Sequence, residues 1–507
     1  MLLQRVAETS RATGSEAGRN AKVALLATLF RDLDEADLRA AVSLLSGESR
    51  RMRVGVGWAS LRELPPPAER PTLGIAETEA VLLQLAQAQG PGSQAVRRAL
   101  LDGLFARATA VEQDFLRAVL VGDLRQGALD ALVGDAVAKA AGVPVADVRR
   151  ALMFRGSAAA VAAAAVTGGA PALRAFGLQL GRPVRPMLAA SAPDLPTALE
   201  RITPAVLDWK LDGIRVQVHR DGGDVAVFTR SLDDITARVP EVVEAALALP
   251  VRSAVLDGEA IALDPEGRPR PFQVTAARTA SRQDVNRLRT EVPLSVNFFD
   301  LLHRDGDDLL DRPATERFAA LADSAPPALL VRRTVTGDPD EAAGFFREAL
   351  SRGHEGLVVK DLTAPYQAGR RGAGWIKVKP RHTLDLVVLA AEWGSGRRRG
   401  WLSNLHLGAR GDEELGPWVM LGKTFKGLTD ELLAWQTREL LARETHRDDW
   451  TVHVRPELVV EIAFDGLQTS PRYPGGLALR FARVLRYRSD KGPLEADTFA
   501  TVRTLAN

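Results

Sequence analysis

Apolar residues recur with the spacing of an α-helix through roughly the first 190 residues of the chain. The stretches with this pattern are 21–45, 77–88, 111–123 and 128–152. A proline-rich break at 64–71 separates two of them, and Gly142-Val143-Pro144 joins two helices within the last. The pattern predicts an all-α region without an internal repeat.

Beyond residue 190 the pattern changes to short β-like runs interleaved with helical ones. Residues 216–220 and 225–230 flank the turn sequence DGGD, which predicts a hairpin. Further β-like runs lie at 254–263, 294–302, 355–360 and 375–380, and helical runs lie at 239–249 and 339–350. This alternation predicts a mixed α/β domain over residues 191–381.

From His382 onward the strand patterns dominate. They lie at 384–394, 401–409, 418–425, 450–456, 458–466 and 479–488, with one helical run at 429–443. Several strands around one helix fit a small closed barrel such as an OB-fold. We therefore expect a multidomain α+β protein with an all-α domain at 1–190, a mixed α/β domain at 191–381 and a β-barrel at 382–507.

Composition narrows the chemistry that these domains can perform. The 507 residues include 66 basic and 64 acidic ones, and the net charge of +2 is by itself no sign of nucleic-acid binding. The chain has no cysteine, which excludes disulfides, thiolate-bound zinc, iron–sulfur clusters and thiol catalysis. Neither the N-terminus nor the Ala-rich stretch 157–176 is apolar enough for a signal peptide or a membrane span, so we expect a cytoplasmic protein.

Lysine is scarce, and one lysine stands out. Only nine of the 66 basic residues are lysine, so arginine is used wherever positive charge alone suffices. Unlike arginine, lysine can lose its proton and attack an electrophile. Lys210, in KLDGIR, ends a β-like run before an Asp212-Gly213 turn, and Arg215 starts the next strand. This position presents an amine at the edge of a loop as a candidate nucleophile.

Further short motifs follow Lys210 in a fixed order. They are LDGE with Glu259, FFDLL with Phe299, EGLVVK with Glu355 and Lys360, WIKVKP with Lys377 and Lys379, and RYRSDK with Arg488 and Lys491. Each alone has an ordinary explanation, such as a solvated hairpin carboxylate or a core phenylalanine. Their joint occurrence in this order is not plausible by chance.

This ordered set resembles the covalent nucleotidyltransferases, and most closely the three-domain ATP-dependent DNA ligases. The resemblance covers the whole chain and implies a helical DNA-binding domain, an ATP-grasp-like nucleotidyltransferase (adenylation) domain and an OB-fold domain. It implies that Lys210 takes AMP from ATP, releasing pyrophosphate, and passes it to the 5′-phosphate of a nick. The 3′-hydroxyl then seals the strand and releases AMP. The implied partner is nicked double-stranded DNA, encircled by a monomer.

The resemblance also implies roles for the residues around Lys210. Glu259 is expected to contact the ribose and, with Glu355, to bind Mg²⁺, which prefers one or two carboxylates plus phosphate oxygens. Phe299 is expected to stack on adenine. The other nucleotide or phosphate contacts that the resemblance implies are Arg215, Arg230, Arg371, Lys377, Lys379, Arg488 and Lys491.

Asp208 departs from the family pattern. Many members have Glu two residues before the lysine, where it helps to read the adenine amine, and Asp is one methylene shorter. We expect Asp208 to contact the nucleotide, and selectivity for adenine is the property that this change affects.

Positive charge in the C-terminal domain suggests contacts with DNA. LGKTFKG is not a P-loop, because Pro417 stands where that motif needs glycine. Lys423, Lys426 and the basic loop 394–401 are instead expected to contact phosphates of the DNA backbone.

Other interpretations stay open at this point. An mRNA-capping guanylyltransferase or an RNA ligase belongs to the same superfamily, although the large helical region and the RSDK ending favour a DNA ligase. A nick-binding protein without activity on the same scaffold is a further alternative. An NAD-dependent ligase is disfavoured because that family carries a Cys-ligated zinc module. The sequence does not distinguish replication, repair and recombination.

Overall fold

The chain forms two compact units. The computed structural model describes residues 1–48, 55–124, 126, 129–281, 284–367, 371–380 and 382–505. Its two units are Met1–Lys377 and Val378–Asn507. The first contains a helical region and a mixed α/β region, and the second is built mainly from strands. The three-domain division with boundaries near 190 and 381 stays a prediction.

The helical region carries one apolar core, to which Leu3, Phe30, Leu44 and Phe105 contribute fully buried side chains. Its helices are α1 (Leu3–Ser15), α2 (Arg19–Arg31), α3 (Glu35–Ser46), α4 (Ile75–Gln87), α5 (Ser93–Arg107), α6 (Ala110–Val121), α7 (Leu129–Ala141), α8 (Val145–Arg155) and α9 (Ala158–Arg174). The prediction of an all-α N-terminal region is confirmed.

Local signals set the helix boundaries. The run predicted at 21–45 is two helices, because the Asp34 side chain accepts a hydrogen bond from the Asp37 backbone (2.8 Å) and so begins α3. Gly142 has a positive φ (65°) and separates α7 from α8 at the predicted joint. Among the described helices, none combines the length and the apolar character needed to cross a membrane.

Two sheets form the mixed region. The first has the strand order β1-β10-β9-β2-β8, and the second has the order β4-β3-β5-β6-β7. Their bounds are β1 (Leu188–Ser191), β2 (Ala205–Lys210), β8 (Arg333–Thr336), β9 (Gly356–Asp361) and β10 (Arg371–Val378), then β3 (Ile214–Asp221), β4 (Asp224–Thr229), β5 (Ser253–Ala262), β6 (Leu294–Arg304) and β7 (Asp307–Asp308). The predicted hairpin is β3 and β4, paired antiparallel from Val216 to Asp221.

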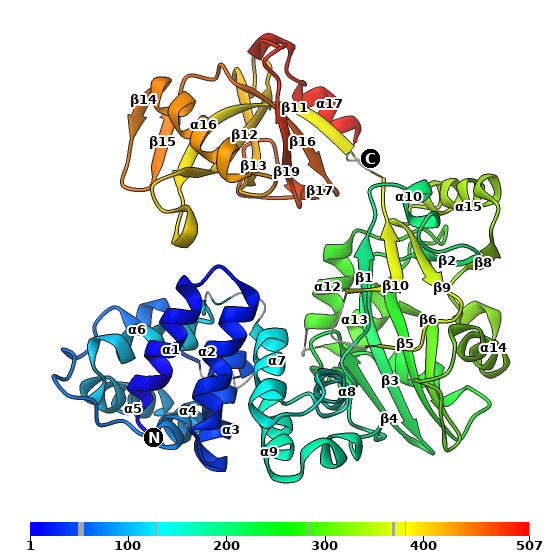
Figure 1. Ribbon diagram of the computed structural model, residues 1–507. Coiled ribbons are helices and arrows are strands. Elements are labelled where there is room, and N and C mark those ends of the chain that lie inside the picture. Colours follow the sequence, from blue (N-terminus) through cyan, green and yellow to red (C-terminus); the bar gives the residue numbers. More distant parts are fainter. Residues whose placement is uncertain are drawn as a thin grey trace. The chain divides into compact units, whose positions relative to one another are not determined.

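Helices cover these sheets. They are α10 (Leu195–Leu199), α11 (Pro240–Leu247), α12 (Phe272–Ala280), α13 (Val285–Glu291), α14 (Ala314–Ser324) and α15 (Pro339–Ser351). Helix α15 packs against β2, β8 and β9, and α14 packs against β6 (Figure 1). Helix α11 packs against β4 and β6. The mixed α/β architecture is as predicted.

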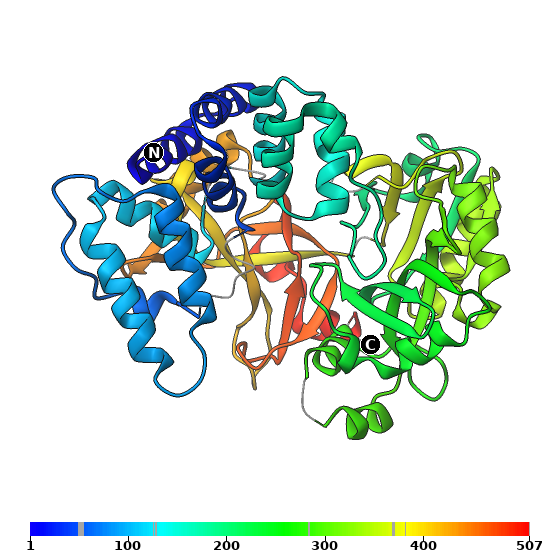
Figure 2. The same cartoon turned by 90° about the horizontal axis from the view of Figure 1, so that it is seen from below.

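The helical region is attached to the mixed region by both polar and apolar contacts. Arg150 of α8 forms two hydrogen bonds of 2.6 and 2.7 Å with the carboxylate of Asp311. Met153 and Phe154 share a core cluster with Val255 and other residues of the second sheet. Figure 1 places α8 beside this sheet, and Figure 2 shows the teal end of the helical region next to the green mixed region. The second sheet is therefore fixed to the helical region by an ion pair and by shared apolar packing.

The second unit is a curved sheet with one long helix. Strand β11 pairs with β12 along one edge and with both β15 and β16 along the other. The bounds are β11 (His382–Trp393), β12 (Leu402–Arg410), β13 (Trp418–Thr424), α16 (Asp430–Ala442), β14 (Glu444–Arg447), β15 (Thr451–Val454), β16 (Val459–Phe464), β17 (Gly466–Thr469), β18 (Leu477–Arg480), β19 (Arg483–Tyr487) and α17 (Phe499–Thr504).

The sheet of the second unit bends back on itself. The Val484 backbone N–H at the start of β19 donates a hydrogen bond to the Lys426 carbonyl, which follows β13 (3.0 Å). Between them Gly427 has φ 85°, and a Cβ there would lie 2.0 Å from the Val484 carbonyl oxygen, so only glycine fits. This hydrogen bond joins the segment after β13 to β19 and so curls the sheet, while full closure into an OB-fold barrel stays a prediction.

Candidate active site

Lys210 is the last residue of β2, in the first sheet. Its backbone carbonyl accepts a hydrogen bond from the Glu355 N–H (2.9 Å), and its ammonium forms an ion pair with the Glu355 carboxylate. The Lys210 and Glu355 side chains are 23% and 15% exposed, respectively. The amine is thus accessible from solvent and already held by a carboxylate.

The second sheet brings Arg215 and Glu259 close to this lysine. Arg215 of β3 lies directly opposite Glu259 of β5 in the antiparallel pair. The turn before β3 passes so close to β5 that a Cβ on Gly213 would lie 2.3 Å from the Ala260 carbonyl oxygen. The glycine of KLDG is therefore required here. The short turn takes the chain from Lys210, at the end of β2, to Arg215, near the start of β3.

Glu259 has an unusual electrostatic environment. Burial raises the pKa of the Glu259 carboxyl to about 7. Lys210 and Arg215 act against this rise, while the neighbouring carboxylates of Asp257 and Glu355 add to it. Glu259 and Glu355 repel each other beside the Lys210 amine. A divalent cation between two such carboxylates would relieve this repulsion, so these residues fit the predicted Mg²⁺. Among the described residues, no group of three or more His, Cys, Asp or Glu side chains forms a metal site.

Arg215 is held by residues that the sequence does not single out. Its guanidinium forms two hydrogen bonds with the Asp257 carboxylate (2.9 and 2.5 Å) and one with the Met187 carbonyl (2.7 Å). The Tyr366 hydroxyl donates to Asp257 (2.7 Å), and accepts from Arg215 (3.2 Å) and from the Met187 N–H (3.0 Å). Burial raises the pKa of Tyr366 well above its usual value. The hydroxyl therefore stays a donor to Asp257.

Phe299 lies next to two cations and a second aromatic ring. Its ring meets Trp375 edge-on, with centroids 5.9 Å apart. The Lys360 ammonium is 4.7 Å from the Phe299 centroid and 4.4 Å from the Trp375 centroid, and the Arg215 guanidinium is 5.4 Å from Phe299. Phe299 is half-buried. Sequence reasoning finds this phenylalanine but misses Trp375.

Asp208 lies on the same strand as Lys210, with its carboxylate engaged inside the protein. It accepts hydrogen bonds from Arg333 (2.6 and 2.8 Å) and pairs with Lys360 (2.6 Å). Asp208 and Lys360 are each only 2% exposed. Burial acts to raise the pKa of Asp208, but Arg333 and Lys360 lower it overall. The contact of Asp208 with adenine stays a prediction, whereas the pairing with Arg333 is a finding that the sequence does not suggest.

The remaining predicted residues belong to several different elements. Arg230 is exposed directly after β4, and Lys377 belongs to β10. The side chain of Arg371 is outside the part of the chain that the structure describes. The second unit contains the other three predicted residues, Lys379, Arg488 and Lys491. The Lys379 ammonium lies 3.4 Å from the Asp465 carboxylate, and Arg488 and Lys491 both donate hydrogen bonds to the Asp385 carboxylate.

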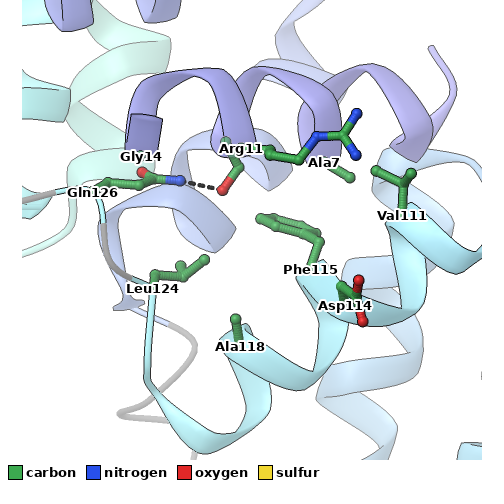
Figure 3. A pocket seen from close by; sticks show the side chains of 10 residues that line it. Ala7, Arg11, Gly14, Val111, Asp114, Phe115, Ala118, Leu124 and Gln126 are labelled. Carbon is green, nitrogen blue, oxygen red and sulfur yellow. Dashed lines mark hydrogen bonds between the residues drawn. The ribbon is translucent and has the colours of Figure 1, made fainter. Parts of the chain in front are cut away.

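A hollow of about 220 Å³ lies in the helical region, between α1 and α6 (Figure 3). Phe115 and Leu124 supply apolar walls, and the Gln126 amide donates a hydrogen bond to Ser10 at one end. None of the residues that line it belongs to the predicted nucleotide site. The hollow is therefore a separate feature of the helical region.

Comparisons with known proteins cover the whole chain. The family described as "ATP dependent DNA ligase domain" matches residues 186–379, "ATP dependent DNA ligase C terminal region" matches 398–491, and "DNA ligase N terminus" matches 61–138. A protein of Beutenbergia cavernae named "Probable DNA ligase" is 58% identical over 516 residues, covering 100% of both chains. A protein of the same name from an Anaeromyxobacter species is 57% identical and covers 100% of this chain and 98% of its own.

The solved structure titled "Pmar-Lig_PreS3" aligns with 95% of this chain and 99% of its own, with a TM-score of 0.59 and 18% identity. At this level of identity the likeness concerns the fold alone.

Proposed function

Because the chain belongs to the ATP-dependent DNA ligase family, we propose that it seals nicks in double-stranded DNA through a lysyl-AMP intermediate on Lys210 and a DNA-adenylate. The observation that carries the proposal is the Lys210 amine, paired with Glu355 and close to Glu259 and Arg215. This site combines a nucleophilic amine with two carboxylates and a guanidinium whose position is fixed. Such a combination suits nucleophilic attack on a polyphosphate.

In the first step the Lys210 amine attacks the α-phosphorus of ATP. A nitrogen–phosphorus bond forms, and the bond from that phosphorus to the bridging oxygen breaks, so pyrophosphate leaves. The ammonium, which pairs with the Glu355 carboxylate, must first give up a proton to solvent, because only the free amine is a nucleophile. The second N–H proton is released to solvent as the phosphoramidate forms.

The second and third steps use the energy stored in that phosphoramidate. The nitrogen–phosphorus bond breaks as a 5′-phosphate oxygen of the nick takes the AMP, and the Lys210 nitrogen takes up two protons from solvent to become the ammonium again. The 3′-hydroxyl then attacks the activated phosphate, loses its proton and expels AMP. Most of the protein's contribution to these transfers is positioning and charge neutralisation.

Glu259 and Glu355 are the residues that would hold Mg²⁺, which when bound would neutralise charge on the phosphates. Phe299 and Trp375 offer aromatic surface for the adenine ring. Arg488 and Lys491 would orient the leaving pyrophosphate during the first step.

A nick-sealing assay with ATP, GTP and NAD⁺ in parallel, on nicked DNA and nicked RNA, tests the proposal. Of the three nucleotides, we expect only ATP to support sealing, and only on nicked DNA. Incubation with ATP should also add one AMP to the wild-type chain, which intact mass spectrometry detects. Transfer of GMP would instead favour a capping type of enzyme, and preferred sealing of RNA an RNA ligase. Absence of any adduct with ATP and Mg²⁺ would leave only a nick-binding protein without activity.

A surface of the second unit suits the nick. We call it the aromatic–basic patch, and it consists of Phe425, Phe481, Lys426 and Arg480. Phe481 is 60% exposed in a left-handed conformation (φ 55°), with the Lys426 ammonium 5.4 Å and the Arg480 guanidinium 5.9 Å from its ring. Exposed aromatic rings between cations are typical of surfaces that contact nucleic-acid backbones and bases.

Lys423, close in sequence, is engaged differently. Its ammonium pairs with the Glu392 carboxylate. Although burial acts to raise the pKa of Glu392, hydrogen bonds from Lys423, His406 and Asn404 lower it to about 2. The charge of Lys423 is thus compensated within the protein, whereas the Lys426 ammonium lies over the exposed ring of Phe481.

This difference gives a matched pair of variants. We expect Lys426→Ala to reduce the slope of log affinity for nicked duplex against log salt by about 0.9, since one phosphate contact is lost. Lys423→Ala should leave that slope unchanged. Fluorescence anisotropy over a salt series measures both, and equal effects of the two variants would contradict the assignment of the patch.

A further inference from the structure

Asp385 joins two of the three basic residues of the RYRSDK motif, Arg488 and Lys491. A single oxygen of its carboxylate, Oδ2, accepts both a hydrogen bond from the Arg488 guanidinium (2.8 Å) and one from the Lys491 ammonium (2.6 Å). The Asp385 side chain is only 10% exposed and that of Arg488 15%. A carboxylate shared by two cations in a poorly hydrated place holds both of them at a fixed separation.

Asp385 itself is rigidly placed. Its backbone N–H donates to the Asp497 carboxylate (2.7 Å), and its carbonyl accepts from the Asp497 N–H (2.8 Å). It lies within β11, directly opposite Glu461 of β16. The backbone of Arg488 is fixed as well, because its backbone N–H donates a hydrogen bond to the Val459 carbonyl (2.8 Å).

Arg488 has a second partner of a different kind. Asp490 accepts two hydrogen bonds from it (2.9 and 2.6 Å), but the Asp490 side chain is 61% exposed. Exposed ion pairs contribute little because water and salt screen them. An anionic ligand can therefore displace Asp490 from Arg488, while the buried contact with Asp385 persists.

We propose that Asp385 is a positioning residue for the formation of lysyl-AMP. It holds Arg488 and Lys491 side by side so that both meet the pyrophosphate as it leaves. As the bond between Lys210 and the α-phosphorus forms, negative charge develops on the departing oxygen, and two cations at a fixed separation stabilise it. The inference rests on the proposed function, in which these two cations serve the first step, and Asp385 itself touches neither ATP nor DNA.

The test separates the steps in the full chain. For Asp385→Asn we expect the single-turnover rate of lysyl-AMP formation from labelled ATP to fall roughly tenfold or more. Pyrophosphate-driven release of AMP from the adenylated chain should slow equally. Sealing of a pre-adenylated nick should stay within about twofold of wild type, as for a residue that this step does not use.

Glu461→Gln is the matched control. Glu461 lies opposite Asp385 on the same sheet and carries the same charge, but its hydrogen-bond partner is Arg486 (2.6 Å), the remaining basic residue of the motif. We expect this variant to keep both rates. Asp385→Glu serves as a second test variant, since it retains the buried charge but moves it by one methylene, and it should also slow the first step selectively.

Two results would overturn the inference: unchanged lysyl-AMP formation in both Asp385 variants, or equal loss of both steps. Arg488→Ala and Lys491→Ala distinguish this failure from that of the proposed function. If they slow lysyl-AMP formation while the Asp385 variants do not, only the inference about Asp385 fails. If they leave it unchanged, the role proposed for the motif itself is wrong.

Discussion

The Lys210→Ala variant is expected to seal nicked DNA with ATP at the background rate, a loss of roughly 10⁴-fold or more, because the covalent intermediate cannot form. Intact mass after incubation with ATP should detect no added AMP. Sealing of a pre-adenylated nick should partly survive, since that step does not use the nucleophile. The partially exposed Lys210 side chain pairs with Glu355, so we expect the variant to stay folded.

Lys210→Arg is the sharper companion to this variant. Arginine keeps the positive charge beside Glu355 but does not deprotonate in proteins, so it too should form no adduct. If Lys210→Arg were active, the residue would act through its charge rather than as a nucleophile. Equal loss with ATP and with the pre-adenylated nick would mean that Lys210 serves a step other than AMP transfer.

The second large effect concerns stability. We expect Asp208→Ala to lower the free energy of unfolding of the first unit by about 3–5 kcal/mol, because it leaves Lys360 and Arg333 without their shared carboxylate in a buried place. Urea unfolding followed by circular dichroism and tryptophan fluorescence measures the change. The double variant Asp208→Ala with Lys360→Met should recover part of the loss, since it also removes a buried charge.

Asp307→Ala is a suitable control for this measurement. Asp307 also accepts two hydrogen bonds from one arginine, Arg312 (2.9 and 2.8 Å), but the two side chains are 56% and 44% exposed. Its loss should cost less than about 1 kcal/mol. Similar losses for Asp208 and Asp307 would show that burial does not determine the contribution of Asp208.

The sequence predicts the fold where one periodicity is sustained. Helices such as α7, α8 and α16, and the hairpin of β3 and β4, follow directly from it. Helix α1 is not predicted, because its sequence is rich in Ser and Thr and has few apolar positions. Its burial against the helical core, through Leu3 and Val6, decides its structure. Tertiary packing of this kind leaves a weak local signal.

The candidate site divides in a similar way. Motif order identifies Lys210, Glu355 and Arg215, and the structure brings these side chains to one place. Motif order misses Tyr366, which helps to hold Arg215, and Asp385, which pairs with Arg488 and Lys491. Each acts on a partner more than 100 residues away along the chain, and periodicity does not reveal such pairings. A weak signal was available for Tyr366, since the chain has only three tyrosines.

The way Arg215 is held has a consequence for the entropy of ligand binding. Its donors are directed at Asp257, Met187 and Tyr366 of the protein itself. A free arginine would lose roughly 0.5–1.5 kcal/mol of rotamer entropy when a ligand immobilises it. Arg215 has already lost this rotamer entropy when the protein folds, because its hydrogen bonds hold the side chain in one position. A phosphate that arrives beside it therefore meets a charge whose position is fixed in advance.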